Sequence, residues 1–525
     1  MRAVNRSVLI VAAVLALLFA GCVKVGPDFH GPGKVKLPDG WNAKAHRSDS
    51  SLAKWWRIYR DPALDRLVDM MYKQNLDLKS AALRIVQARA LLGISHGMSF
   101  PQKQSISGSY VSADSSRTDR ISKSDVSFDM GWELDLWGKY ARGVESAEAD
   151  LYAAIASYDD ILVSLIAELA RSYIQYCTAQ ERIAFARRNI EIQKYVTKVT
   201  EIQFNSGNVS ELDMQQARTQ LHSTKAALYE LKLSKIRARN AIAMLLGINP
   251  KEADVYLRSK RYRDNLGKYM DKDKGTLQLE EKKAVSLGTS IIPRPFFDPN
   301  RHIDAQLITR RPDVRMAEHI AHSRSAQIGI AKAELYPSFS LLGTIGYGND
   351  SNTPHIISVI AGPSFAWNIF QYGRIKNSIR LQDAIFEESL LNYNKSVLEA
   401  VHEVSYALDS YRLTLRQLRE NEAAVKASIR AFNISMKQYS DGLVSYQRLL
   451  NSVEKLTRFQ DQYARIKGDL AIEVASLYKA LGGGWQLSRG RRYLSSDSVR
   501  RMKERTDWGD MLKEDNVVLP KGWSR

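Results

Sequence analysis

The chain carries an internal duplication that constrains its fold more than any other feature of its sequence. The same landmark residues recur at a separation of about 235 positions along the 525 residues. The pairs are Trp132 with Trp367, Gly138 with Gly373, Gly207 with Gly442, Leu246-Gly247 with Leu481-Gly482 and, displaced by one position, Phe100-Pro101 with Tyr336-Pro337. Because these landmarks are kept while the sequence between them has diverged, we interpret the chain as two copies of one structural unit within one assembly.

The amino terminus has the pattern of a bacterial export signal. Arg2 and Arg6 precede an apolar run over residues 8–19, which is too short to span a bilayer as a stable helix. The run ends at Phe19-Ala20-Gly21-Cys22, which resembles the lipobox of bacterial lipoproteins. We therefore expect residues 1–21 to be removed and Cys22 to be lipidated, the alternative being an uncleaved signal anchor. Because one acyl chain binds a membrane weakly, further membrane contact is expected.

Composition excludes several classes of protein. Cys177 is the only cysteine besides Cys22, so no disulfide framework is expected. No run of about 18 apolar residues follows the signal, so any later membrane crossing would have to be made by strands of a closed β-barrel. The net charge of +19 comes from scattered basic residues, and an exported protein rarely meets nucleic acid. No nucleic-acid partner is expected.

Four segments alternate between apolar and polar residues, as strands with one polar and one apolar face do. The clearest alternation has its apolar residues at every second position from Val126 to Leu136. The opposite parity carries four carboxylates, at Asp125, Asp129, Glu133 and Asp135. The four segments predict one β-hairpin over residues 103–137 and another over residues 338–370.

These strands suit a membrane barrel, which needs about 9–11 residues per crossing. Four strands are too few to close a barrel, so a trimer with twelve strands is the smallest odd-fold assembly that could form one. The polar parity would then line a water-filled duct. We expect its four carboxylates to favour the passage of cations, although the chain as a whole is basic.

A long helical pattern follows each predicted hairpin. Apolar residues recur at steps of four and three over residues 397–439 and again over residues 144–173, which is the heptad seam of helices packed side by side. Helical hairpins are therefore predicted over residues 140–247 and 374–482. They would turn at Gly207 and Gly442, where glycine can adopt a left-handed conformation, and Ser210 and Ser445 could cap the returning helices.

Several motifs together resemble the TolC-type outer membrane efflux proteins, in the lipoprotein branch typified by OprM and NodT. They are Val25-Gly26-Pro27-Asp28-Phe29 after the cysteine, Asp61-Pro62 with Leu64 and Asn75 at the start of the first repeat, Arg311-Pro312-Asp313-Val314-Arg315 with Ala317-Glu318 at the start of the second, and the closing segment from Leu477 to Trp485. With this resemblance the chain divides into a signal peptide (1–21), a lipid-anchored segment (22–55), repeat one (56–250), a linker (251–305), repeat two (306–485) and a basic tail (486–525). The linker is longer than is usual in the family.

The resemblance implies an α+β membrane protein. Three chains would form a twelve-stranded outer-membrane β-barrel, with four strands from each chain, that continues into a long α-helical barrel in the periplasm. The family resemblance also implies a periplasmic adaptor protein at the helical tips and an inner-membrane pump of the resistance-nodulation-division type. The protein would be a passive exit duct for drugs or other small molecules, anchored by lipid in the outer membrane, without cofactor or metal and without enzymatic activity.

The resemblance also assigns the helical tips their roles. The adaptor-docking surface would comprise Gly207, Asn208, Ser210, Gly442, Leu443, Val444 and Ser445. The family usually places aspartates six and nine residues beyond the second tip glycine, where they line the closed periplasmic aperture. This chain has Arg448 and Asn451 there and keeps an acid, Asp213, in the first repeat. Arg448 would either face the pore and pair with Asp213 of an adjacent hairpin, or turn outward to the intersubunit groove or the adaptor.

Three alternatives belong to other classes or cargoes. His319 and His322 lie three apart beside Glu318, a spacing that can ligate a metal, but no third ligand is marked and no catalytic arrangement is recognisable. A periplasmic adaptor lipoprotein would also carry a lipidated cysteine and a helical hairpin, but not the duplication with four strands. An exit duct of a type I protein secretion system would share the fold and differ in its cargo.

Overall fold

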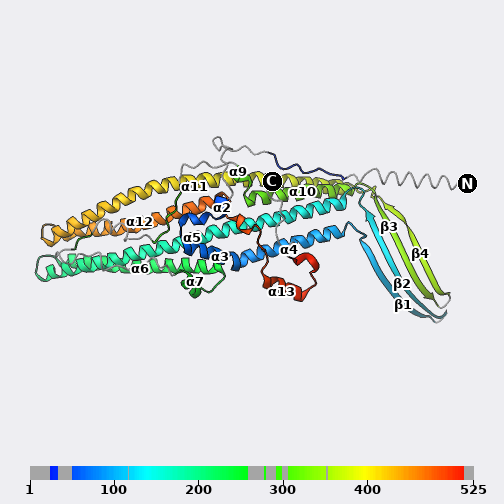
Figure 1. Ribbon diagram of the computed structural model, residues 1–525, viewed down its shortest axis with the longest axis horizontal. Helices are drawn as coiled ribbons and strands as arrows, with labels where there is room; N and C mark the ends of the chain where they lie inside the picture. The colour runs from blue at the N-terminus through cyan, green and yellow to red at the C-terminus, as the bar shows by residue number, and fades with distance from the viewer. Residues whose placement is uncertain are drawn as a thin grey trace. The chain divides into compact units, whose positions relative to one another are not determined.

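The computed structural model describes residues 24–33, 50–115, 118–257, 277–279, 291–297, 306–350 and 353–513 (Figure 1). The predicted signal peptide, Cys22, most of the linker and the end of the tail lie outside the described residues. Two compact units share the chain. The strand unit is drawn from Met1–Lys36, Ala81–Tyr158 and Pro312–Leu398, and the helical unit from Leu37–Ser80, Asp159–Arg311 and Glu399–Arg525.

The strand unit contains one antiparallel sheet with the order β1-β2-β3-β4. Its strands are β1 (Lys103–Ser115), β2 (Thr118–Leu134), β3 (Ser338–Asp350) and β4 (Thr353–Ala366). The inner pair β2 and β3 joins the two halves of the duplicated chain, with Phe128 opposite Ile345. The sheet is thus built from two hairpins side by side, one from each half.

The register separates apolar from polar side chains across all four strands. Ile106, Phe128, Ile345 and Val359 are directly paired neighbours and therefore share one face. Their side chains are 42 to 78% exposed in the single chain. The opposite face carries hydroxyls and carboxylates that bond across the strands. The sheet is therefore amphipathic, and its apolar face is open in the single chain.

Two long helical hairpins follow from the heptad seams. Helix α5 (Lys139–Asn205) pairs with α6 (Glu211–Leu246), and α11 (Arg374–Ser440) pairs with α12 (Tyr446–Ala480). Helices α5 and α11 have 67 residues each, or about 100 Å at 1.5 Å per residue. The strand unit also holds α10 (Pro312–Ala333), and α4 (Leu76–Gly97) precedes β1. None of the described helices is both long and apolar enough to cross a membrane.

The helical unit also contains several short elements. They are α2 (Ser50–Ala53), η1 (Trp55–Tyr59), α3 (Pro62–Gln74), α7 (Pro250–Leu257), α9 (Gln306–Thr309), η3 (Trp485–Ser488), α13 (Ser496–Arg505) and η4 (Gly509–Leu512). The last two belong to the tail, and η3 spans the boundary between repeat two and the tail. The structure describes the tail as far as residue 513. Ser488 donates a hydrogen bond of 3.0 Å to buried Asp159, and the Arg491 guanidinium lies 4.9 Å from the centre of the Tyr72 ring.

Residues of the motifs at the repeat boundaries form hydrogen bonds with the long helices of the hairpins. Asp61 caps α3 by accepting from the Ala63 N–H at 2.9 Å, and it also accepts from the Tyr173 hydroxyl at 2.9 Å. Asn75 ends α3 and donates to the Leu245 carbonyl at 2.8 Å. Buried Arg311 donates to the Ala480 carbonyl at 2.6 Å. Each of these motif residues satisfies a backbone group at a helix end.

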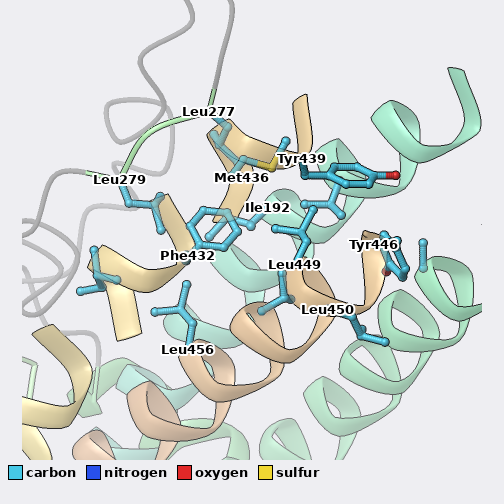
Figure 2. Close-up of a cluster of buried hydrophobic side chains, with 14 of the residues drawn as sticks. Ile192, Leu277, Leu279, Phe432, Met436, Tyr439, Tyr446, Leu449, Leu450 and Leu456 are labelled. Atoms are coloured by element: carbon cyan, nitrogen blue, oxygen red, sulfur yellow. The ribbon is translucent and has the colours of Figure 1, made fainter. Parts of the chain in front are cut away.

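A cluster of buried apolar side chains packs both hairpins and the linker together (Figure 2). Phe432 and Met436 of α11 meet Ile192 of α5 there, and Leu277 and Leu279 of the linker lie against them (Figure 2). The Asn433 amide holds this part of the linker, since it accepts from the Leu279 N–H and donates to the Leu279 carbonyl, both at 2.9 Å. The linker thus docks on α11 within a few turns of the Gly442 turn.

A second part of the linker, at residues 291 and 292, binds a buried carboxylate of α5 that also pairs with α12. Glu181 of α5, whose side chain is 2% exposed, accepts from the backbone N–H groups of Ile291 and Ile292 at 3.0 and 3.2 Å. Lys467 of α12 donates to the same carboxylate at 2.8 Å. Burying a carboxylate is costly unless it is paired and hydrogen-bonded, and here three donors meet that need.

Helices α5 and α12 approach closely at Gly468. A β-carbon there would lie 2.9 Å from Thr178 Cγ2 and closer still to Oγ1. Threonine is stiff about χ1 and its hydroxyl already donates to the Ile174 carbonyl at 2.8 Å, so it cannot turn away freely. We predict that Gly468→Ala lowers the free energy of unfolding by about 1–3 kcal/mol.

Thermal melting of the purified protein measures this effect. The control is Gly143→Ala on α5, where a β-carbon meets open space and should leave stability unchanged or raise it. Adding Thr178→Ala to Gly468→Ala should restore the melting temperature. A Gly468→Ala protein that melts like the wild type would show that the contact is not tight.

Candidate functional site

The polar face of the sheet positions two of the predicted strand carboxylates. Asp125 accepts from the Ser109 hydroxyl at 2.6 Å, and Asp129 accepts from the Thr344 hydroxyl at 2.8 Å. Both aspartates are partly exposed and lie on the face opposite Phe128. Because hydroxyls of the neighbouring strands hold them, the two carboxylates form a fixed negative strip along β2.

The other two predicted acids serve the start of α5. Glu133, near the end of β2, accepts from the Tyr140 hydroxyl at 2.9 Å and lies 3.7 Å from the Lys139 ammonium. Burial and this hydrogen bond raise the pKa of Tyr140. Asp135 lies beyond the end of β2, so its assignment to the strand was wrong. Its carboxylate accepts from the N–H groups of Tyr140 and Ala141 at 3.1 and 2.8 Å, which have no acceptor within the helix.

The segment after the cysteine is fixed by a buried arginine. The Arg142 side chain is 1% exposed, and its Nε donates to the Val25 carbonyl at 3.1 Å. Its Nη2 donates to the Gly26 carbonyl at 3.2 Å and to Asp28 at 2.9 Å. The Val25 N–H donates in turn to the Trp137 carbonyl at 3.1 Å. Residues 24–33 are therefore anchored where β2 leads into α5, and we call them the anchor segment.

Glu145 completes this cluster. It accepts from Arg142 at 2.9 Å, forms an ion pair with Lys24 and lies 3.1 Å from Nε2 of His322. Burial by itself would raise the pKa of Glu145, but the hydrogen bonds from Lys24, His322 and Arg142 lower it below its usual value. The His322 ring stacks on Phe29 at 4.8 Å. Of the motif residues, Asp28 thus pairs with Arg142, and Phe29 stacks on His322, which contacts Glu145.

The two histidines of α10 that the sequence offered as metal ligands, His319 and His322, contact different residues. His322 belongs to the Glu145 cluster, while His319 lies beside the Tyr152 ring at 5.6 Å. Burial lowers the pKa of His319 to about 4, with smaller contributions from Arg315 and His322. Within the described ranges, no group of three histidine, cysteine or acidic side chains is placed to hold a metal ion.

The two helical tips have the same backbone geometry. Gly207 and Gly442 have φ angles of +74° and +72°, which glycine adopts without steric cost. The Asn208 N–H donates to the Gln203 carbonyl and the Leu443 N–H to the Gln438 carbonyl, at 2.9 and 2.8 Å. The duplicated glycines therefore close both long helices in the same way.

The tips differ in what they present. Asn208, Ser210 and Ser445 are exposed, and the Leu443 side chain is 72% exposed. Val444 instead packs partly against the buried apolar cluster of Figure 2. Among the described tip residues that the resemblance assigns to docking, Leu443 is thus the exposed apolar side chain.

Helix capping also differs between the repeats. Ser210 and Asp213 form a reciprocal capping box, in which the Ser210 hydroxyl accepts from the Asp213 N–H and the Asp213 carboxylate accepts from the Ser210 N–H. The expectation that Ser445 caps α12 in the same way was wrong, since its side chain makes no capping hydrogen bond. The Arg448 N–H donates instead to the Ser445 carbonyl at 3.2 Å, so the backbone satisfies that donor.

The predicted aperture residues lie one to two turns up the returning helices. Arg448 and Asn451 are exposed on α12, and Asn451 accepts from the Gln447 amide at 3.2 Å. Asp213 is engaged in its capping box. No ion pair of Arg448 occurs within the described part of a single chain, and its pairing with Asp213 of an adjacent hairpin stays a prediction.

Comparison with known proteins identifies the family. The model of the outer membrane efflux protein family matches residues 67–248 and 305–483. The chain belongs to this family. It is 28% identical to nodulation protein T of Rhizobium leguminosarum bv. viciae over 479 residues, which cover 90% of this chain and 93% of the relative. It is 26% identical to outer membrane protein OprJ of Pseudomonas aeruginosa, with 91% and 96% covered.

Solved structures of outer-membrane channels have the same fold. The channel OprN superposes with a TM-score of 0.72 at 29% identity, covering 88% of this chain and 99% of that chain. The Campylobacter jejuni channel CmeC has a TM-score of 0.73 at 22% identity, with 92% and 99% covered. These findings confirm the predicted family, its fold class and an outer membrane efflux function. The relatives are channel proteins and not enzymes.

Sequence reasoning missed the residues that anchor chain segments. Arg142 and Glu181 each hold a separate piece of backbone, yet both are single charges within long helices rich in charge. Neither residue lies within the apolar seam predicted over residues 144–173, so that periodicity gave no signal for them. Periodicity alone cannot name their partners, because these come from distant segments.

We predict that Arg142→Met releases the anchor segment. Removing one partner of a buried ion pair destabilises a protein by about 3–5 kcal/mol, because the remaining groups lose their hydrogen bonds. Hydrogen exchange at residues 24–33 should accelerate and the melting temperature should fall. The control Arg84→Met replaces an exposed arginine of α4 in the same unit and should change neither quantity. Unchanged exchange at Val25 in Arg142→Met would contradict the anchoring role.

Proposed function

We propose that three copies of this chain form the outer-membrane exit duct of a tripartite efflux system. A periplasmic adaptor and an inner-membrane pump of the resistance-nodulation-division type would deliver drugs or other small molecules to it. The observation that carries the proposal is the amphipathic sheet, combined with the family membership. One face of the sheet exposes apolar side chains that suit lipid, and the other holds hydroxyls and carboxylates that suit water.

The need for a trimer follows from the number of strands. A chain with four strands cannot close a barrel, and it leaves ladder hydrogen bonds unmade at β1 and β4. Three copies give twelve strands, a number that membrane barrels use. The homotrimer then removes both sheet edges and directs every apolar face toward lipid.

Relatives support the cargo class. Similar proteins include the pyoverdine export outer membrane protein OpmQ of Pseudomonas aeruginosa, 26% identical, and the toluene efflux pump outer membrane protein TtgF of Pseudomonas putida, 23% identical. Pyoverdine and toluene are small molecules of different polarity. A duct that accepts both kinds would have a wide, water-filled lumen and would leave selection to the pump.

Two further assignments accompany the duct. Cys22, outside the described residues, would carry the lipid anchor, and the tight hold on the anchor segment beginning at Lys24 supports a fixed attachment. Asp125 and Asp129 of each subunit would line the lumen near its wall. Since nearby charges outweigh distant ones, these carboxylates would favour cations.

Deleting the gene from its host should raise the intracellular accumulation of a fluorescent cationic dye, and the wild-type gene should restore export. Gly442→Leu should fail to restore it, because a β-carbon costs about 1–2 kcal/mol in a left-handed conformation and the tip must reshape. Trimers should persist, since this cost is small. Gly490→Leu is the control, with a φ of +70° and open surroundings on the tail, and should restore export.

One outcome would contradict the proposed cargo, and another would contradict the docking role of Gly442. Loss of a secreted protein from the medium, with dye accumulation unchanged, would identify a type I protein secretion duct. Loss of the trimer in Gly442→Leu would assign the tip glycine to folding instead of docking.

We predict that Arg448 sets the resting state of the periplasmic aperture. If three guanidinium groups meet near the axis, charges at close range interact by a few kcal/mol at an effective dielectric constant near 20. Arg448→Ala and Arg448→Asp should then alter single-channel conductance and ion selectivity. The control Arg465→Ala, far from the tip on α12, should leave both unchanged. Unchanged currents in the Arg448 variants with impaired export would place Arg448 at the docking surface.

A further inference from the structure

Three residues of the linker, Leu277, Gln278 and Leu279, contact the hairpins near the Gly442 turn, and we call them the clasp. The leucines are each 3% exposed, while Gln278 between them is exposed. Asn433 of α11 binds both backbone groups of Leu279. Because Asn433 precedes Gly442 by nine residues, the clasp lies about 14 Å from the turn along the helix.

The apolar cluster that the clasp joins also contains the turn of α12 that carries the predicted aperture residues. Leu449 and Leu450 are buried in this cluster (Figure 2). In the sequence they lie between Arg448 and Asn451, which are both exposed. The same turn of α12 thus has buried leucines on one side and both aperture residues on the other. A movement of the cluster would therefore move the aperture residues with it.

Polar contacts at the same level connect α11 to its neighbours. The hydroxyls of Ser435 on α11 and Ser452 on α12 are hydrogen-bonded at 2.9 Å. The Tyr439 hydroxyl of α11 donates to the Thr200 hydroxyl of α5 at 3.2 Å, and the Gln203 amide of α5 donates to the Tyr439 carbonyl at 3.3 Å. The helix that holds the clasp is thus joined to its own hairpin partner and to the other hairpin.

The linker is held more firmly farther from the tips. Glu181 binds the backbone of residues 291 and 292 and pairs with Lys467, and the Phe297 ring packs edge-on against Tyr411 at 5.0 Å. In the clasp, an uncharged amide makes the hydrogen bonds instead. Breaking uncharged hydrogen bonds costs less than separating a buried ion pair. The clasp is therefore the contact that opens first.

We propose that the clasp is an autoinhibitory contact, which holds the helical tips in their resting arrangement and must leave α11 before the periplasmic aperture widens. Its departure would remove two leucines from the apolar cluster and both hydrogen bonds from Asn433. The turn of α12 that carries Arg448 and Asn451 would then be free to move. This inference rests on the proposed function, because it requires these residues to line the aperture of a trimeric duct.

Currents through purified full-length trimers in planar lipid bilayers test the proposal. Asn433→Ala removes both hydrogen bonds to the clasp and keeps its leucines, and should raise the ratio of open to closed time by about tenfold or more. Leu279→Ser places a hydroxyl in the apolar cluster and should raise this ratio further. Two controls should gate like the wild type: Asn394→Ala, at an exposed position of α11 in the strand unit, and Gln278→Ala, at the exposed residue of the clasp.

Hydrogen exchange over residues 446–453 of α12 provides a second measurement on the same trimers. Faster exchange together with longer opening, in Asn433→Ala and not in the controls, supports the proposal. Faster exchange with unchanged currents would overturn it, because the clasp would then only stabilise the fold. Unchanged exchange and currents would overturn it as well.

Assembly and conduction of the wild type separate this inference from the function on which it rests. Trimers are assayed by gel, and if Leu279→Ser loses them, Asn433→Ala decides alone. Loss of trimers in both variants would assign the clasp to assembly and overturn the proposal. Failure of the duct itself would appear in the wild type, as trimers that carry no current, whereas failure of the clasp appears only when the variants are compared with a conducting wild type.

Discussion

The exposed apolar face of the four-stranded sheet is the constraint on which the rest of the structure depends. Paired side chains such as Phe128 and Ile345 present a continuous apolar surface, while the opposite face is hydrogen-bonded and polar. Burying such a surface provides about 25 cal/mol per Å², so a chain that left it in water would be unstable. Membrane insertion and assembly of several chains satisfy this requirement together, and the same alternation supplies the polar lining of a duct.

Duplication gives the molecule two helical hairpins of the same design. Two helices of 67 residues each, both closed by a left-handed glycine, give the two hairpins matching lengths and matching turns. The repeats have nevertheless diverged at the helical tips. The first tip has a capping box that includes the Asp213 carboxylate. At the second tip the Ser445 side chain makes no capping hydrogen bond, and Leu443 and Arg448 are exposed. Pseudo-symmetric scaffolds thus carry chemically different tips.

Buried charges fix the segments that have no periodicity of their own. Arg142 holds the anchor segment, and Glu181 together with Asn433 holds the linker against the hairpins. In each case a side chain on a long helix satisfies backbone groups of an irregular segment, which would otherwise be buried without partners. The long linker therefore packs into the helical unit at Leu277, Leu279, Ile291 and Ile292 and is not a simple tether.

The sequence by itself determined the duplication, the strand and helix types, the tip glycines and the family, because these depend on periodicities and local conformations that neighbouring residues encode. It did not reveal that Asp135 caps α5, that the backbone replaces Ser445 as a cap, or that Arg142 and Glu181 bind distant backbone. Residues that are distant in the chain come into contact only in the folded protein, so only the tertiary structure decided which of them are partners.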